Sequence, residues 1–208
     1  MSGNRNLPPY TTYPADQLQD LLAAQTPGGS STQDSLQQAF GALYQPFNPQ
    51  LITQFSNMAA GSITGTAIWI PTNTLLTGCK IRNGQAAVGT LPTVARFGLA
   101  DMTGKVLALG PNQNDLASWA AGPRAFPFTA QFTTTYSGIY FPMFINSTAF
   151  GTTVPQAGGI NINAAAASAD SPSVPLCFVV TGQTDLPAVG ASVSLGSQPN
   201  QLRWIGVY

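Results

Sequence analysis

The sequence contains no histidine and no glutamate among its 208 residues. Its acidic side chains are seven aspartates, which seven lysines and arginines balance to a formal net charge of zero. Most enzyme chemistry near pH 7 uses a histidine, or a carboxyl group with a tuned pKa, as acid or base. The lack of histidine excludes Ser–His–Asp and Cys–His arrangements and His-rich metal sites. We therefore expect a binding or structural protein, with no enzyme activity and no cofactor.

Charged residues are also scarce, at 7% of the chain, against about 25% in an ordinary soluble domain. So little charge protects a monomer poorly against association. We expect copies of the chain or other subunits to cover much of the surface; the alternative is a soluble monomer rich in neutral polar residues. The few basic residues argue against a nucleic-acid partner, because phosphate binding needs clustered Lys and Arg.

The sequence has no apolar run that approaches the length of a membrane span and no apolar signal core at its start. It therefore predicts no membrane insertion, and synthesis and assembly in a cytosol. Cys79 and Cys177 have no metal-binding spacing. Without a secretory signal, two reduced buried thiols are favoured over a disulfide. For the same reason, Asn146-Ser-Thr is interpreted as an ordinary turn and not as a glycosylation site.

Helical spacing of apolar residues occurs only in residues 1–60. Residues 14–25 place several leucines on one face, and a second short helix is predicted from residue 31 or 32. An apolar but irregular stretch follows. We predict an extended arm over residues 1–60, which either packs on its own domain or anchors the protein in a larger assembly. The residues that would form this anchor are Leu18, Leu22, Leu36, Phe40, Leu43, Phe47 and Phe55.

From residue 61 to residue 208 the sequence has the alternation and turns of short β-strands. A hairpin is predicted over 93–109, with Gly104 in the left-handed conformation after Asp101. In the strand 75–82, one face would hold Leu75, Thr77, Cys79 and Ile81. Because no helical period follows residue 60, we predict an all-β fold, an antiparallel jelly-roll-like sandwich. The predicted strands are 66–70, 75–82, 93–100, 105–109, 126–132, 139–145, 174–180 and 202–208.

Two features of this region suggest contacts with a partner. Residues 151–173 are mostly small and neutral, and the segment is too long for a routine connection. It is therefore interpreted as a loop. Ile160 and Ile162 would then contact a partner, unless the loop is a mobile excursion. Trp119 is expected to be the most exposed tryptophan. It could stack on a sugar ring, although a place in the core or in a subunit interface is favoured.

Other catalytic and metal motifs were sought in the sequence. It contains no Gly-rich phosphate loop, and its aspartates are scattered. A two-carboxylate hydrolase is therefore a remote alternative. Aspartates in turns cap their own backbone more often than they bind calcium, and no metal site is predicted.

The run Val94-Ala-Arg-Phe-Gly-Leu-Ala-Asp-Met-Thr-Gly-Lys-Val-Leu-Ala108 resembles part of a recurrent bacteriophage virion domain. The pattern continues with the linker Ser118-Trp119, an aromatic strand over 126–132, Ser137-Gly-Ile-Tyr140 and an apolar strand over 204–208. The resemblance covers about residues 64–208. It implies a jelly-roll module of head fibres, decoration proteins or tail appendages, commonly trimeric and non-enzymatic. It transfers no catalytic residue.

We therefore predict a bacteriophage virion structural protein, assembled in the host cytoplasm. Its partners would be other virion proteins and further copies of itself, with a trimer favoured. The first alternative is a carbohydrate-binding module for a host surface glycan, with Trp119 and the 151–173 loop at the site. The second is a capsid-forming jelly roll, against which the lack of a basic N-terminal segment counts.

Overall fold

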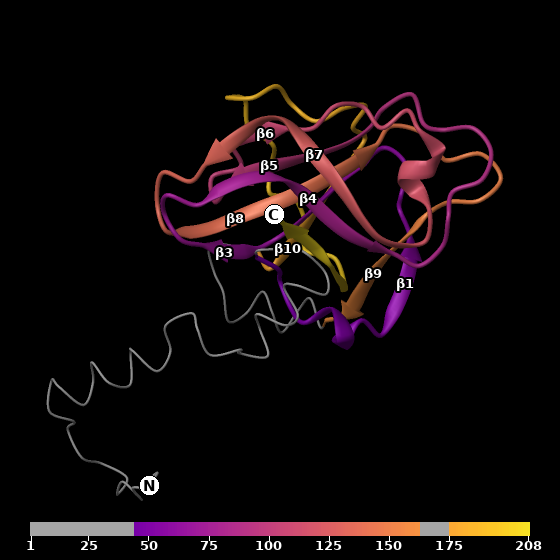
Figure 1. Cartoon of the computed structure of the whole chain (residues 1–208), viewed down its shortest axis with the longest axis horizontal. Coiled ribbons are helices and arrows are strands. Elements are labelled where there is room, and N and C mark those ends of the chain that lie inside the picture. The colour runs from indigo at the N-terminus through magenta and orange to yellow at the C-terminus, as the bar shows by residue number, and fades with distance from the viewer. Residues whose placement is uncertain (1–43, 163–174) are drawn as a thin grey trace, which may run out of the picture. The chain divides into compact units, whose positions relative to one another are not determined.

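The computed structural model describes residues 44–162 and 175–208 (Figure 1). Both predicted helices lie outside these residues. The described chain forms two antiparallel sheets of six strands each, with short 3₁₀ turns η1 (Pro49–Leu51) and η2 (Leu116–Trp119). The first sheet holds β1 (Gln54–Asn57), β4 (Leu75–Asn83), β7 (Gly122–Thr133), β9 (Gln156–Asn161), β11 (Gln201–Arg203) and β12 (Ile205–Val207). The second holds β2 (Ser62–Thr66), β3 (Ile68–Ile70), β5 (Ala95–Asp101), β6 (Val106–Leu109), β8 (Gly138–Asn146) and β10 (Cys177–Thr181).

The strand pairs are nested inside one another along the sequence. The innermost pair is β5 with β6, followed outward by β4 with β7, by β2 and β3 with β8, and by β1 with β9. Successive pairs alternate between the second and the first sheet. This is the connectivity of a hairpin rolled into a jelly roll, so the predicted fold class is confirmed. The later strands extend it: β10 joins β2, and β11 and β12 join β9 and β4.

The predicted hairpin between β5 and β6 is confirmed. One carboxylate oxygen of Asp101 accepts hydrogen bonds from the backbone N–H groups of Thr103, at 2.8 Å, and Lys105, at 3.1 Å. Gly104 has a φ of +83° and is therefore left-handed, as the turn requires. A side chain there would also collide with the carbonyl oxygen of Val193, 2.1 Å from the position of its Cβ. Glycine is thus required at residue 104 by conformation and by packing.

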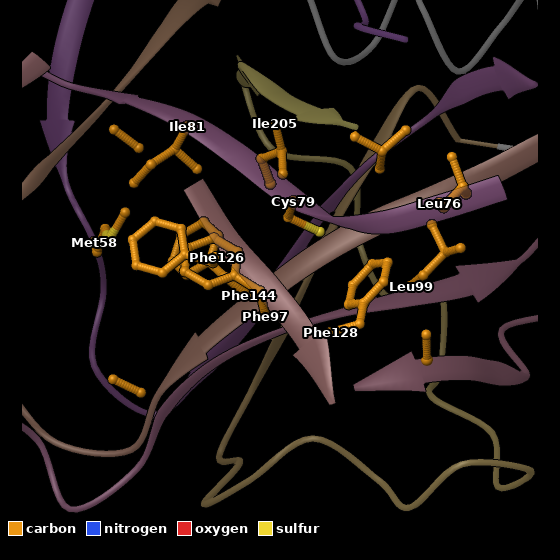
Figure 2. Close-up of a cluster of buried hydrophobic side chains, with 14 of the residues drawn as sticks. Met58, Leu76, Cys79, Ile81, Phe97, Leu99, Phe126, Phe128, Phe144 and Ile205 are labelled. Atoms are coloured by element: carbon orange, nitrogen blue, oxygen red, sulfur yellow. The ribbon is translucent and has the colours of Figure 1, made fainter. Parts of the chain in front are cut away.

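Aromatic rings fill the space between the two sheets (Figure 2). The rings of Phe97 and Phe126 are stacked with their centroids 4.1 Å apart, and the Phe144 ring lies 5.8 Å from that of Phe97. Phe126 and Phe128 are buried and Phe132 is half-buried against the core, whereas Pro127, Thr129 and Gln131 are exposed. The strand predicted over 126–132 is therefore confirmed as part of β7.

The predicted face of β4 is wrong at its start, for Leu75. Leu76 is fully buried, and Leu75 is 48% exposed. The register of β4 with β7 shifts between Leu76 and Gly78, so a bulge reverses the alternation at that point. Only glycine fits at residue 78, because a Cβ there would lie 2.5 Å from the carbonyl oxygen of Phe126. Cys79 and Ile81 do face the core as expected.

Strand β8 is central in the second sheet, and its residues 140–146 are buried on both faces. The N–H of Ser147 donates to the carbonyl of Val94, just before β5. Backbone N–H groups along a strand point alternately to its two neighbours, so the nitrogen of Pro142 points away from β5, toward β2 and β3. At that position the neighbouring strand is interrupted between β2 and β3. Proline therefore fits at residue 142, because the break in the adjacent ladder leaves no bond that it would have to make.

Candidate functional site

The boundary expected at residue 60 does not coincide with the edge of the sandwich, because residues 44–60 belong to it. Tyr44 and Val207 exchange two backbone hydrogen bonds, of 3.2 and 2.9 Å. The indole Nε1 of Trp204 donates to the carbonyl oxygen of Phe47, at 3.0 Å. We call residues 44–57 the arm root. Five of the predicted anchor residues lie before it, outside the described part of the chain: Leu18, Leu22, Leu36, Phe40 and Leu43.

Arg203 fastens the arm root to the sheet. Its guanidinium donates to the backbone carbonyls of Ser56, at 2.9 Å, Ala157, at 3.0 Å, and Asn57, at 3.2 Å. Burial lowers the pKa of Arg203 to about 10, which still leaves it protonated at neutral pH. A partly desolvated cation of this kind is stabilised by the carbonyl dipoles around it. The side chain therefore joins β1, β9 and β11 through one charged group.

The two described anchor candidates, Phe47 and Phe55, lie against their own domain. Phe47 is half-buried, and Phe55 is 40% exposed. The Phe55 ring occupies space that side chains would fill at residues 84 and 158, where the sequence has glycine. A Cβ at Gly84 would lie only 2.4 Å from that ring. For this part of the arm, packing on the same domain is the observed arrangement.

Trp119 is buried, with 1% of its surface exposed, so the expectation that it is the most exposed tryptophan is wrong. The short turn η2 folds it over the end of the core, with its ring centroid 5.0 Å from that of Phe126 and 5.1 Å from that of Phe150. Asp115 caps this turn by accepting from the N–H of Ala117, at 3.0 Å. A sugar cannot stack on Trp119 without unfolding this part of the core. Trp69 is the exposed tryptophan, at 59%.

The loop predicted over 151–173 is wrong for residues 156–161, which form β9. Ile160 is half-buried and pairs with Leu202, and the N–H of Ile162 donates to the carbonyl of Asn200, at 2.9 Å. Glycines in this strand permit close approach: a Cβ at Gly159 would lie 2.6 Å from the carbonyl oxygen of Leu202. The predicted partner residues are thus engaged within the sheet. Residues 163–173 lie outside the described part.

An exposed row of apolar side chains crosses one end of the outer face of the second sheet. Trp69 of β3 pairs with Ile139 of β8. Met102 directly follows β5, and continuing the pairing of β5 with β8 by one residue places Met102 opposite Ile139. Leu176 lies next to Ala67, whose N–H donates to it at 2.8 Å. Trp69, Met102 and Leu176 are 59%, 46% and 43% exposed. We call these residues the apolar row: Trp69, Ile139, Met102 and Leu176.

The described aspartates serve the fold. Asp101 closes its hairpin, Asp115 caps η2, and Asp185 pairs with Arg96 at 3.2 Å. Within residues 44–162 and 175–208, no three Cys or Asp side chains are grouped as metal ligands would be. In the same residues no helix has the length and apolar character needed to cross a membrane.

Cys79 and Cys177 are buried and form no disulfide, and they lie in different sheets. Desolvation raises the pKa of both thiols, that of Cys177 to about 12. Neither is therefore a reactive thiolate at neutral pH. Asn146 is also fully buried, and its amide donates to the carbonyls of Met58 and Ala59, both at 3.2 Å. In the folded protein this side chain is inaccessible for glycosylation, and Asn146 is the last residue of β8 and not part of the turn that was predicted.

No protein-family model and no curated protein matches this chain. The resemblance to bacteriophage virion domains therefore stays a prediction. The candidate sites are the apolar row, the arm root and the pocket described below.

Proposed function

We propose that the chain is a non-enzymatic structural protein of a bacteriophage virion, a short head-decoration, fibre or tail appendage. The apolar row is the observation that carries this proposal. Large apolar side chains standing together in water indicate a surface that another protein covers. None of the four residues of the row is charged, so a second copy can approach it without bringing like charges together.

The arm root supports the anchoring part of the proposal. Residues 1–43 lead into a segment that is fastened to the first sheet by Arg203, Trp204 and Val207. The apolar row lies on the second sheet. Attachment through the arm and contact between copies would therefore use different sheets of one rigid sandwich, as an appendage with several copies requires.

The contact between copies is tested by the mass of the full chain in solution, measured by light scattering. We expect an oligomer for the wild type and a shift toward monomer for Trp69→Asp, because a buried unpaired carboxylate is costly. Val88→Asp is the matched control, since Val88 is 49% exposed and lies outside the row. A wild-type monomer at high concentration, or equal effects of the two substitutions, would contradict the proposal.

The location is tested by immunogold electron microscopy of phage particles produced by the strain that encodes the chain. We expect label on intact particles, on the head or on the tail. Particles made with a chain that lacks residues 1–43 should lose the label, while the free truncated chain keeps the oligomeric state of the full chain. Unlabelled wild-type particles would exclude a virion protein, and labelled truncated particles would exclude anchoring by the arm.

A further inference from the structure

A pocket of about 490 Å³ opens where β6 and β7 diverge. Strand β7 pairs with β4 through Pro127 and again from Phe132, so residues 128–131 have no partner on β4. Strand β6 is the last strand of the second sheet and pairs with β5, and on its other side Val106 bonds to the backbone of Gly190 and Ala191. One end of the gap is closed where a Cβ at Gly110 would lie 2.8 Å from the carbonyl oxygen of Pro127. The volume is in the range of small-molecule sites.

Arg96 lines this pocket with a guanidinium that the protein uses only in part. Its side chain is 25% exposed, and its one charge partner in the described residues is Asp185, with Nε 3.2 Å from Oδ1. That contact lacks hydrogen-bond geometry, and Nε is buried without a hydrogen bond. A guanidinium carries several N–H donors that match the two oxygens of a carboxylate. Because Nε is buried, the donors of Arg96 that a ligand in the pocket could reach are the terminal N–H groups of the guanidinium.

The remaining lining combines polar and apolar groups. Thr129 and Gln131 come from the part of β7 that has left the ladder, and their backbone groups are free of β4. Leu107, Leu109 and Val189 supply aliphatic surface. The pocket thus presents a guanidinium, a hydroxyl, a carboxamide and backbone groups that do not pair with β4, beside an apolar wall. Such a lining suits a ligand that carries an anionic group, several hydroxyl groups and an apolar face.

We propose that the pocket binds a sugar acid, a pyranose ring that carries a carboxylate. The carboxylate pairs with the fork of Arg96, as planar bidentate recognition favours. The ring hydroxyls bond to Gln131, Thr129 and the nearby backbone, and the apolar ring face rests on Leu109 and Val189. This site does not include the apolar row or the arm, so it is tested separately from the structural role proposed above.

The test uses the full chain and three probes, glucuronate, glucose and acetate, titrated by ligand-observed NMR. We expect saturable binding of glucuronate, and binding at least about tenfold weaker for glucose, which lacks the charge, and for acetate, which lacks the ring. Arg96→Gln should weaken glucuronate binding by about tenfold or more. Asp185→Asn should preserve or tighten it, because the competing carboxylate is lost while its oxygen acceptor stays.

Two further variants keep the result interpretable. Arg124→Gln is the charge-matched control, since Arg124 bonds to the carbonyl of Ala120 and does not line the pocket. Gln131→Ala removes an exposed side chain without threatening the fold and should weaken binding several-fold. The proposal is overturned by any of three results: no saturable glucuronate binding, equal binding of glucuronate with glucose or acetate, or Arg96→Gln and Gln131→Ala that both bind like the wild type.

Discussion

The outer face of the second sheet has a covered end and an open end. At the covered end, Phe141, Met143 and Ile145 of β8 are buried beneath Leu186 and Val193. At the open end, Ile139 of the apolar row is half-buried, and Trp69, Met102 and Leu176 continue the same face into solvent. Both ends are equally apolar in sequence. What differs is whether another part of the chain reaches them.

The cover comes from the connection between β10 and β11. Its backbone runs beside the β5–β6 hairpin, where Ala191 accepts from the N–H of Val106 and Val193 donates to Gly104, both at 2.8 Å. Arg96 and Asp185 add an ion pair to the same connection. Hydrogen bonds to an otherwise open edge thus hold an irregular segment over the sheet. The apolar row has no such cover in the described part of the chain.

The largest difference between the two ends is expected for truncation of an aromatic side chain. Phe141→Ala should lower the free energy of unfolding by about 3–5 kcal/mol, because it leaves a cavity at the covered end. Trp69→Ala at the open end should cost the monomer less than about 1 kcal/mol, since the side chain is 59% exposed in the single chain. Urea denaturation of both variants measures this. Similar losses would mean that the open end is also packed in solution.

Removing the cover itself should have the next largest effect. Leu186 is 4% exposed, and Leu186→Ala should destabilise the protein by about 2–3 kcal/mol. Val189→Ala is the control in the same connection, where the side chain is 60% exposed, and should cost less than about 0.5 kcal/mol. Thermal unfolding of the two variants compares them. An unchanged midpoint for Leu186→Ala would show that the connection does not stabilise the sheet.

A smaller loss is expected where β2 meets the ring of Phe178 at the covered end. A Cβ at Gly65 would lie 2.3 Å from Cε1 of that ring, so Gly65→Ala must displace it, at a cost of about 1–3 kcal/mol. Adding Phe178→Leu should recover part of this loss, because the smaller side chain makes room. A double-mutant cycle measures the coupling. Additive effects of the two changes would refute the clash.

The pH dependence near Cys177, between Leu176 of the open end and Phe178 of the covered end, should be the smallest effect. Burial raises the pKa of this thiol from 9.0 to about 12. Above pH 9 the thiol ionises in the unfolded chain before it does in the folded one, so stability that is present below pH 9 is lost as the pH rises toward 12. Denaturation of wild type and Cys177→Ala at pH 8 and pH 10 measures this. Parallel losses in the two proteins would rule out the thiol as the cause.

Local signals in the sequence predicted the local structures well. Asp101 and Gly104 specify their own turn, and the rings of Phe126 and Phe128 mark the buried face of β7 without reference to any partner. The errors occurred where the partner is distant. The bulge that exposes Leu75 depends on how β7 meets β4. Trp119 is buried because η2 folds back over rings from other strands. Neither arrangement has a local sequence signal.

The candidate sites show the same limit. Residues 156–161 read as a loop because their glycines and small residues lack strand propensity, yet those glycines let β1 and β11 approach closely. The Gly158-Gly159 pair was the available signal, and it indicates close backbone approach as readily as flexibility. The pocket at Arg96 could not be predicted, because it depends on the point at which β7 leaves β4.

The nested strand pairs have a consequence for the order in which the protein folds. The innermost hairpin closes a short loop, whereas Arg203 and Ser56 meet across 147 positions of the chain. Closing a long loop costs more entropy and is repaid only after the inner strands are in place. We therefore expect β5 and β6 to pair early and the arm root to dock last. The arm root would then be the last part of the fold to form. The other strands of the sandwich would be paired before it docks.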